Sequence, residues 1–281
     1  MFSNIYQGKK VLVTGHTGFK GTWLTAWLLN LGANVIGISK DTPTQPSMFD
    51  ILGLADKIQH YIVDIRDIEL LSQVISDEKP DFVFHLAAQA IVLTSYSEPL
   101  ETISSNVMGT ANLLESLRIS NHQCVAIIIT SDKAYDNVEQ IWGYKENDKM
   151  GGKDVYSGSK GAAELIIKSY YHSFFKADRS NVRLAVARAG NVIGGGDWAK
   201  DRIVVDAVVA WSQGKQVEIR SPHATRPWQH VLEPLGGYLD LGSSLYNNKE
   251  LNGEGFNFGP RAEQNRTVKE LLSDLSEHWD F

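Results

Sequence analysis

The chain has 281 residues, 43% of them hydrophobic, and a formal net charge of −6 at pH 7, which excludes a disordered or fibrous protein and argues against a nucleic-acid or anionic-membrane surface. Its one cysteine, Cys124, excludes an internal disulfide framework or a cysteine-based zinc cluster. Residues 1–10 lack the apolar core of a signal peptide, and no stretch approaches the roughly twenty apolar residues of a membrane span, so we expect a cytoplasmic protein.

Apolar, β-branched runs alternate with helical stretches along the first 190 residues. Continuous apolar runs are typical of strands covered on both faces, and their alternation with helices predicts an α/β fold of the Rossmann type, with a doubly wound parallel sheet. The expected strands are 11–13, 34–38, 61–63, 82–86, 125–129 and 184–187, the expected helices are 19–31, 68–78, 100–120 and 156–176, and 41–47 is an expected loop.

The alternation weakens beyond residue 190, which predicts a division of the chain into two parts. Residues 1–190 form the Rossmann domain, and residues 191–281 form mainly a smaller C-terminal substrate lobe, with some pieces returning to the main sheet. In this second part we expect a loop at 194–197, a helix at 203–213, a strand at 217–219 and a helix at 235–245.

A glycine-rich turn follows the first strand and opens the first helix. Gly15 would let the backbone turn tightly, Gly18 would let it approach a phosphate, and Gly21 would allow close packing of helix on strand. A turn of this kind binds the pyrophosphate of a dinucleotide at the helix N-terminus. The spacing GxxGxxG, rather than GxGxxG, favours the short-chain dehydrogenase/reductase type of Rossmann domain.

A tyrosine and a lysine four residues apart lie in the expected helix 156–176. Residues i and i+4 share a helix face, so the Tyr156 phenol and the Lys160 ammonium can project into one cleft. A phenol is a useful base near neutral pH when its pKa falls from about 10 by roughly three units, which is about 4 kcal/mol. A neighbouring cation supplies part of that change.

Polar and small residues follow the second, third and fourth strands, where a cofactor would lie. Ser39 is followed by Lys40 and Asp41 at the position of the adenosine ribose. An acid there favours NAD and a cation can accommodate the extra phosphate of NADP, so this pair leaves both open. Asp64 could accept a hydrogen bond from the adenine amino group or cap a helix, and for Asp67 we favour the cap.

The segment directly after the fifth strand reads Thr130-Ser131-Asp132-Lys133. A plain reductase needs a hydroxyl there, which Ser131 provides, to polarise the reacting oxygen. The carboxyl group of Asp132 and the amine of Lys133 are then surplus, and they suggest a second acid/base event such as the elimination of water. The alternative is an exposed ion pair in a loop.

Side chains in the second part of the chain suit an anionic ligand. Asn191, Arg202 and Arg226 are candidate ligands for a diphosphate, because the arginine fork matches phosphate oxygens. The alternative for each is a solvated surface position. No metal is predicted, because metal-ligand spacing is lacking among the histidines His16, His85, His223 and His230.

Together these motifs resemble the extended short-chain dehydrogenase/reductases that act on nucleotide sugars, and most closely the CDP-glucose 4,6-dehydratases. The resemblance extends from about residue 9 to the C-terminus, and Lys133 favours this branch because dTDP-glucose dehydratases carry glutamate there. It implies that NAD is bound by Gly15, Thr17, Gly18, Phe19, Gly21, Ser39, Asp64, Ile65, Leu86, Ala87, Tyr156 and Lys160, and the nucleotide sugar by Asn191, Arg202, Arg226 and His230.

The resemblance also implies a reaction. Tyr156, assisted by Lys160, removes the proton of the sugar 4-hydroxyl, which Ser131 holds, while hydride leaves C4 for NAD. The ketone acidifies the C5 proton, Asp132 protonates the departing 6-hydroxyl, and hydride returns to C6. Lys133 is the C5 base if its pKa is depressed, or else it stays protonated and stabilises the enolate. The product would enter deoxysugar biosynthesis for lipopolysaccharide O-antigen.

Two other functions use the same fold. A nucleotide-sugar 4-epimerase shares the cofactor and the Tyr-Lys pair but has no need of Asp132 and Lys133, and a non-catalytic NAD-binding sensor needs no proton relay. The helices 100–120 and 156–176 resemble the pair that forms a homodimer interface in this family, although their apolar residues could face only their own sheet. Family members usually continue beyond residue 281, so a truncated sugar pocket is an expectation as well.

Overall fold

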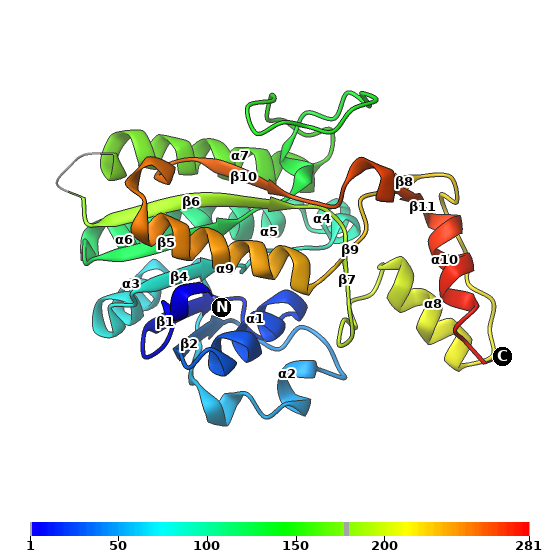
Figure 1. Cartoon of the computed structure of the whole chain (residues 1–281), viewed down its shortest axis with the longest axis horizontal. Helices are drawn as coiled ribbons and strands as arrows, with labels where there is room; N and C mark the ends of the chain where they lie inside the picture. Colours follow the sequence, from blue (N-terminus) through cyan, green and yellow to red (C-terminus); the bar gives the residue numbers. More distant parts are fainter. Residues whose placement is uncertain (1, 177–179, 281) are drawn as a thin grey trace.

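A parallel sheet forms the centre of the molecule. The computed structural model describes residues 2–176 and 180–280, which fold around seven strands in the order β10-β6-β5-β4-β1-β2-β3 (Figure 1). Neighbouring strands pair in parallel, as predicted. The strands are β1 (Lys10–Thr14), β2 (Asn34–Ser39), β3 (Gln59–Ile62), β4 (Phe82–His85), β5 (Cys124–Ile129), β6 (Val182–Ala189) and β10 (Gly255–Phe258).

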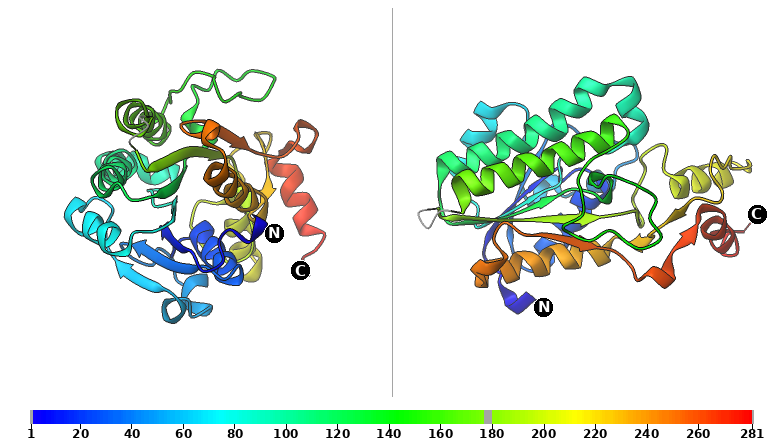
Figure 2. Two further views of the ribbon diagram at one scale, coloured as in Figure 1. Left: turned by 60° about the vertical axis from the view of Figure 1, so that its left-hand side comes forward. Right: turned by 90° about the horizontal axis from the view of Figure 1, so that it is seen from above.

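Helices cover both faces of this sheet (Figure 2). Because successive strand side chains point to opposite faces, β1 contributes Val11 and Val13 to one core and Leu12 to the other. Helices α1 (Phe19–Asn30) and α9 (Leu232–Asn247) pack over the first core. The second lies beneath α3 (Ile68–Glu78), α6 (Gly109–Ser120) and α7 (Val155–Tyr170). This arrangement confirms the doubly wound Rossmann fold.

Two long predicted helices are present but contain wider turns. The segment 100–120 consists of α5 (Pro99–Ile103), a π-helical turn at Ser104–Met108 and α6. The segment 156–176 consists of α7 and a π-helical turn at Tyr171–Phe175. Apolar periodicity does not reveal such turns, because a π turn inserts a single residue. Three α-helices were not predicted, α2 (Met48–Ile51), α4 (Val92–Ser97) and, near the end of the chain, α10 (Val268–Ser276).

The C-terminal part consists of small elements beside the carboxyl edge of the sheet. Helices α8 (Ile203–Ser212) and α10 (Val268–Ser276) lie together at one end of the molecule (Figure 1). The C-terminal part also contains two pairs of two-residue strands. They are β7 (Val192–Ile193) with β9 (Gln229–His230), and β8 (Thr225–Arg226) with β11 (Arg266–Thr267).

Three elements of the C-terminal part can be compared with what the sequence predicts. The predicted strand at 217–219 is wrong: this segment has no ladder partner and lines a shallow hollow against α8. A β-branched run becomes a strand only where another strand offers its backbone. The predicted helix 235–245 begins earlier, at Leu232, because Pro234 is tolerated in a first turn. Strand β10 extends the main sheet beside β6, as expected for a returning piece.

Among residues 2–176 and 180–280, no helix combines the length and the apolar character needed to cross a membrane.

Two glycines of the turn after β1 are required by close backbone contacts. Gly15 has φ +73°, and a Cβ atom there would lie 2.7 Å from the backbone nitrogen of Ala87. A Cβ atom on Gly21 would lie 2.0 Å from the carbonyl oxygen of Gly15. Because both obstacles are backbone atoms, a side chain at either position displaces the turn itself.

We expect Gly21→Ala to destabilise the fold by at least about 1–3 kcal/mol, the usual cost of overpacking. Gly158→Ala is the matched control, because Gly158 is also helical and a Cβ atom there meets nothing within 4 Å. Denaturant unfolding measures both free energies. Equal stability of the two variants would contradict the role of the Gly15 contact.

Candidate active site

The candidate site lies where the strand order reverses, between β1 and β4. In an open α/β sheet, ligands bind outside the carboxyl ends of the strands at this switch point. Hydrogen bonds join the two loops there: the amide of Leu86 donates to the Thr14 carbonyl at 3.1 Å, and the amide of Ala87 donates to the Thr14 hydroxyl oxygen at 3.2 Å. Leu86 and Ala87 therefore lie against the glycine-rich turn, and their contact with a cofactor stays a prediction.

The turn itself has the form of a phosphate cradle. Gly18 is the N-cap of α1 and provides no side-chain cap, so N–H groups of the first turn are available to a ligand. Thr17 fixes the turn to the end of β2, because its hydroxyl donates to the Asp41 carbonyl at 2.7 Å and its amide to Ser39 Oγ at 3.4 Å. Together with the close contact at Gly15, these features fit a bound dinucleotide.

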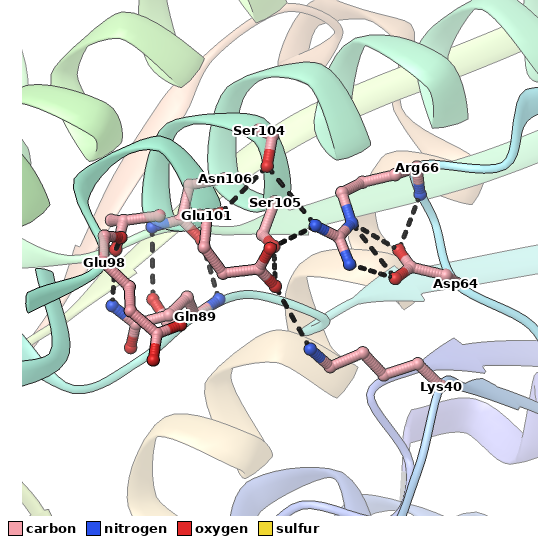
Figure 3. Close-up of polar contacts among 10 residues, drawn as sticks. Lys40, Asp64, Arg66, Gln89, Glu98, Glu101, Ser104, Ser105 and Asn106 are labelled. Carbon is pink, nitrogen blue, oxygen red and sulfur yellow. Dashed lines mark hydrogen bonds and ion pairs between the residues drawn. The ribbon is translucent and has the colours of Figure 1, made fainter.

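Charged side chains meet at the edge where an adenosine group would lie (Figure 3). The Arg66 guanidinium donates to both Asp64 carboxylate oxygens, and its amide donates to Asp64 Oδ1 at 2.9 Å. These hydrogen bonds from Arg66 lower the pKa of Asp64. Asp67 caps α3 by accepting from the amide of Leu70 at 3.0 Å, as predicted. The adenine contact of Asp64 stays a prediction.

The Tyr-Lys pair begins α7, which Asp154 caps through the amide of Ser157 at 2.9 Å. Tyr156 and Lys160 are both buried, each about 7% exposed. Burial, and next to it Asp132, raises the pKa of Tyr156 to about 12, although the Ser131 hydroxyl and Arg202 lower it. Burial lowers the pKa of Lys160 to about 8. A phenol that acts as a base requires a lowered pKa, whereas the pKa of Tyr156 is raised here, so a further positive charge is needed at the phenol.

A 3-10 turn at Asp132–Ala134 directly follows β5 and carries the surplus acid and amine. The Ser131 hydroxyl donates to Asp132 Oδ1 at 3.0 Å and accepts from the Lys133 amide at 3.2 Å. Asp132 and Lys133 are half-buried, unlike the exposed loop pair of the alternative. Since Ser131 and Asp132 both act on the pKa of Tyr156, the structure brings these three side chains close together.

Lys20 is a cation of this cleft that the sequence analysis did not select. It lies in the first turn of α1, and burial together with Arg202 lowers its pKa to about 8, while Asp132 acts in the opposite direction. The available signal was a lysine inside the glycine motif, between Phe19 and Gly21. Its position places a third amine near the Tyr-Lys pair, because Lys160 also acts on its pKa.

Arg202 and His230, two of the predicted nucleotide-sugar ligands, approach the glycine-rich turn. Arg202 pairs with Asp197 and lies over the Phe19 ring, 6.0 Å from its centroid. His230 is exposed on β9, with its ring 6.3 Å from that of Trp23 in α1. These contacts bring the C-terminal part to the cofactor turn.

Asn191 and Arg226 are placed near the site only by their neighbours in the chain, since Gly190 and Pro227 lie beside Asp132. The Asn191 carbonyl accepts from the amide of Gln229 at 3.1 Å. Arg226 is half-exposed on β8 and precedes Pro227, whose ring lies 2.8 Å from where a Gly190 Cβ would be, beside Asp132. Within residues 2–176 and 180–280, no three His, Cys, Asp or Glu side chains gather to hold a metal ion, and a metal-free site stays a prediction.

Comparison with known proteins shows the family of this chain. The sequence pattern of the GDP-mannose 4,6 dehydratase family matches residues 12–239. The chain is also 50% identical over 279 residues to CDP-glucose 4,6-dehydratase of Salmonella typhimurium, covering 98% of this chain and 78% of that protein. The chain belongs to the GDP-mannose 4,6-dehydratase family.

More distant relatives of this family member include both dehydratases and epimerases. CDP-paratose 2-epimerase of Salmonella typhi is 26% identical, with 96% of this chain and 84% of that protein covered. In solved structures, the fold is similar to dTDP-glucose 4,6-dehydratase (DesIV double mutant) from Streptomyces venezuelae with NAD and DAU bound. The TM-score is 0.82 at 20% identity, with 95% and 80% of the two chains covered. At this identity the likeness shows the fold alone.

A buried charge pair behind the site, also missed by the sequence analysis, joins its elements in this dehydratase-family chain. Arg188 of β6 donates to both oxygens of Glu164 on α7, at 2.8 and 2.9 Å, and the two side chains are 7% and 5% exposed. The Thr130 hydroxyl at the end of β5 donates to the same carboxylate, and Arg188 also donates to the Tyr135 phenol at 2.7 Å. This network fixes α7, and with it Tyr156, against the turn that carries Ser131.

We expect Arg188→Met to cost about 3–5 kcal/mol of unfolding free energy, because it leaves the Glu164 carboxylate buried without its partner. The double variant Glu164→Met with Arg188→Met should recover most of that loss, since no charge then remains buried. The matched control Arg118→Met removes a half-exposed pair with Glu115 and should cost less than about 1 kcal/mol. Urea unfolding compares the variants. A double variant as unstable as Arg188→Met would show that the buried charge is not the cause.

Proposed function

We propose that the chain catalyses the NAD-dependent dehydration of CDP-glucose to CDP-4-dehydro-6-deoxyglucose. The observation that carries the proposal is the proximity of Ser131, Asp132 and Tyr156 at the carboxyl edge of the sheet that also carries the glycine-rich turn. A hydroxyl, an acid and a phenol at a hydride site suit an oxidation coupled to loss of water. The 50% identity to a CDP-glucose 4,6-dehydratase supports the choice of reaction and of nucleobase.

NAD fits the turn after β1, because the contacts at Gly15 and Gly21 leave a bare backbone and the start of α1 is open to a pyrophosphate. Bound NAD would accept the C4 hydride and return it to C6, and its cationic ring would help to lower the pKa of Tyr156. The residues that we propose to hold it are Gly15, Thr17, Gly18, Phe19, Gly21, Ser39, Asp64, Ile65, Leu86, Ala87, Tyr156 and Lys160.

The first proton transfer uses the α7 pair. Tyr156 removes the proton of the 4-hydroxyl, which the Ser131 hydroxyl holds in place. Lys160, buried one turn further along α7, stabilises the phenolate when it is protonated.

The elimination uses the turn after β5. Once the 4-ketone is formed, the C5 proton is acidic. Lys133 removes it as a free amine and returns it to C5 when hydride is added at C6, or Lys133 stays protonated and stabilises the enolate while another base carries this proton. Asp132 protonates the departing 6-hydroxyl, so that water leaves.

We propose Asn191, Arg202, Arg226 and His230 as the ligands of the nucleotide sugar, because Arg202 and His230 approach the start of α1. An epimerase would also use Tyr156 and Lys160, but its reaction has no departing hydroxyl for Asp132 to protonate.

We also propose a homodimer with α5, α6 and α7 at its interface and a cytoplasmic location, where NAD and nucleotide sugars are available. Apolar side chains on α5, on α7 and on the π-helical turn between α5 and α6 are exposed, with Leu100 79%, Leu165 58% and Met108 53% exposed. Their exposure argues against the alternative that these apolar residues face only their own sheet.

Tyr156→Phe should lower turnover of CDP-glucose by about 10²–10⁴-fold, the usual contribution of a positioned proton acceptor. Mass spectrometry of the loss of one water from CDP-glucose measures it, with dTDP-glucose and UDP-glucose run alongside. Tyr170→Phe is the matched control, because Tyr170 lies on the same helix and its phenol bonds Glu115, away from the cleft. If the unaltered protein changes the mass of none of these sugars, the dehydratase proposal is wrong.

Leu165→Asp should convert the dimer to a monomer, because it replaces the exposed apolar side chain of Leu165 on α7 with a charge. Sedimentation velocity measures the change. Ile51→Asp is the control, since Ile51 is 72% exposed on α2, on another side of the molecule. A monomeric unaltered protein, or dimers of equal strength in both variants, would contradict this interface.

A further inference from the structure

The adenosine end of the cofactor site contains two cations that converge on one carboxylate (Figure 3). Lys40 directly follows Ser39, the last residue of β2, and Arg66 lies in the loop after β3. Glu101 reaches them from α5, 61 and 35 residues further along the chain. The sequence analysis left Lys40 and Asp41 undecided between NAD and NADP and gave no role to Glu101.

Glu101 divides its two oxygens between the cations. Its Oε1 accepts from Lys40 Nζ at 3.3 Å, and its Oε2 accepts from Arg66 Nη1. The opposite side of the Arg66 guanidinium is held by Asp64, with Nε 3.0 Å from both carboxylate oxygens. The Arg66 fork is therefore occupied on two sides, and Lys40 is turned toward α5.

This group of four side chains has no net charge, since two cations face two carboxylates. Although burial acts to raise it, hydrogen bonds from Lys40 and Arg66 lower the pKa of Glu101, so the carboxylate stays ionised at neutral pH. The side chains of Lys40, Arg66 and Glu101 are 49%, 32% and 29% exposed, and pairs this accessible add little to stability. The arrangement calls for another explanation.

NADP differs from NAD by a phosphate on the adenosine ribose, and a cation after the second strand is the usual means of accommodating it. Lys40 has the right position, and the guanidinium of Arg66 has the right shape. A phosphate brought here would meet a group without net positive charge and a carboxylate between the two cations. Like charges placed together repel each other, so Glu101 would reject the phosphate.

We propose that Glu101 determines the cofactor preference of this enzyme, excluding the 2′-phosphate of NADP by neutralising Lys40 and Arg66. The proposal rests on the proposed NAD-dependent function. Removing the Glu101 charge frees Lys40, leaves Arg66 paired with Asp64 alone and gives the group a net charge of +1, which favours the phosphate-bearing cofactor.

The test compares binding of NADH and NADPH, by calorimetry, to the unaltered protein and to Glu101→Gln. The ratio of NADPH to NADH affinity should rise at least about ten-fold in Glu101→Gln, and the gain should shrink at high salt. Glu98→Gln is the matched control: it removes the same charge at the start of α5, where within the described residues the Glu98 carboxylate pairs with no cation. Adding Lys40→Met to Glu101→Gln should abolish much of the gain.

Each other outcome overturns the proposal. An equal gain in Glu98→Gln would mean a general charge effect, and an unchanged ratio in Glu101→Gln, with NADH still bound, would refute the role of Glu101 while leaving NAD dependence intact. An unaltered protein that binds NADPH as tightly as NADH would refute it too. An unaltered protein that binds neither cofactor would refute the NAD-dependent function along with this inference. Thermal melting of each variant verifies that the fold is kept.

Discussion

The buried pair of Glu164 and Arg188 is the interaction on which the geometry of the site depends. It links α7 to β6, and through the Thr130 hydroxyl it links both to the end of β5. Tyr156 lies on α7 and Ser131 follows β5, so the distance between the proposed base and the hydroxyl that holds the substrate is set by this pair. A buried charge pair contributes little net stability compared with apolar packing, but it permits few arrangements. Geometry, more than stability, is what it supplies.

Burial opposes the ionisation of the proposed catalytic groups themselves. The cleft raises the pKa of Tyr156 and lowers that of Lys160, which are both shifts toward the neutral forms. A phenol in this setting becomes a base only when positive charge arrives with the ligands. In the proposed function that charge comes with the cofactor, so proton abstraction is confined to the loaded site, where the ketone can be carried on to elimination.

The charge pairs at the adenosine end are open to solvent, and they therefore act differently from the buried pair. The contacts of Glu101 with Lys40 and Arg66 contribute little to folding, yet they decide which charge an incoming cofactor meets. Glu101 comes from α5, beyond β4, whereas the two cations follow β2 and β3. A cation next to Ser39 is therefore insufficient to predict the cofactor, since a residue distant in the sequence neutralises it.

The sequence by itself determined the parallel sheet, the position of the glycine-rich turn and the grouping of Tyr156 with Lys160, because these depend on local apolar runs, on backbone conformations that require glycine and on helix periodicity. Its failures were of another kind. The run at 217–219 had the composition of a strand without a partner, and the π turns in the long helices left no periodic signal. Only the tertiary structure decided that Glu164 meets Arg188, that Glu101 meets Lys40 and that Lys20 faces the cleft. These contacts join residues tens of positions apart, and their partners are chosen by the packing of helices on the sheet, which no local pattern records.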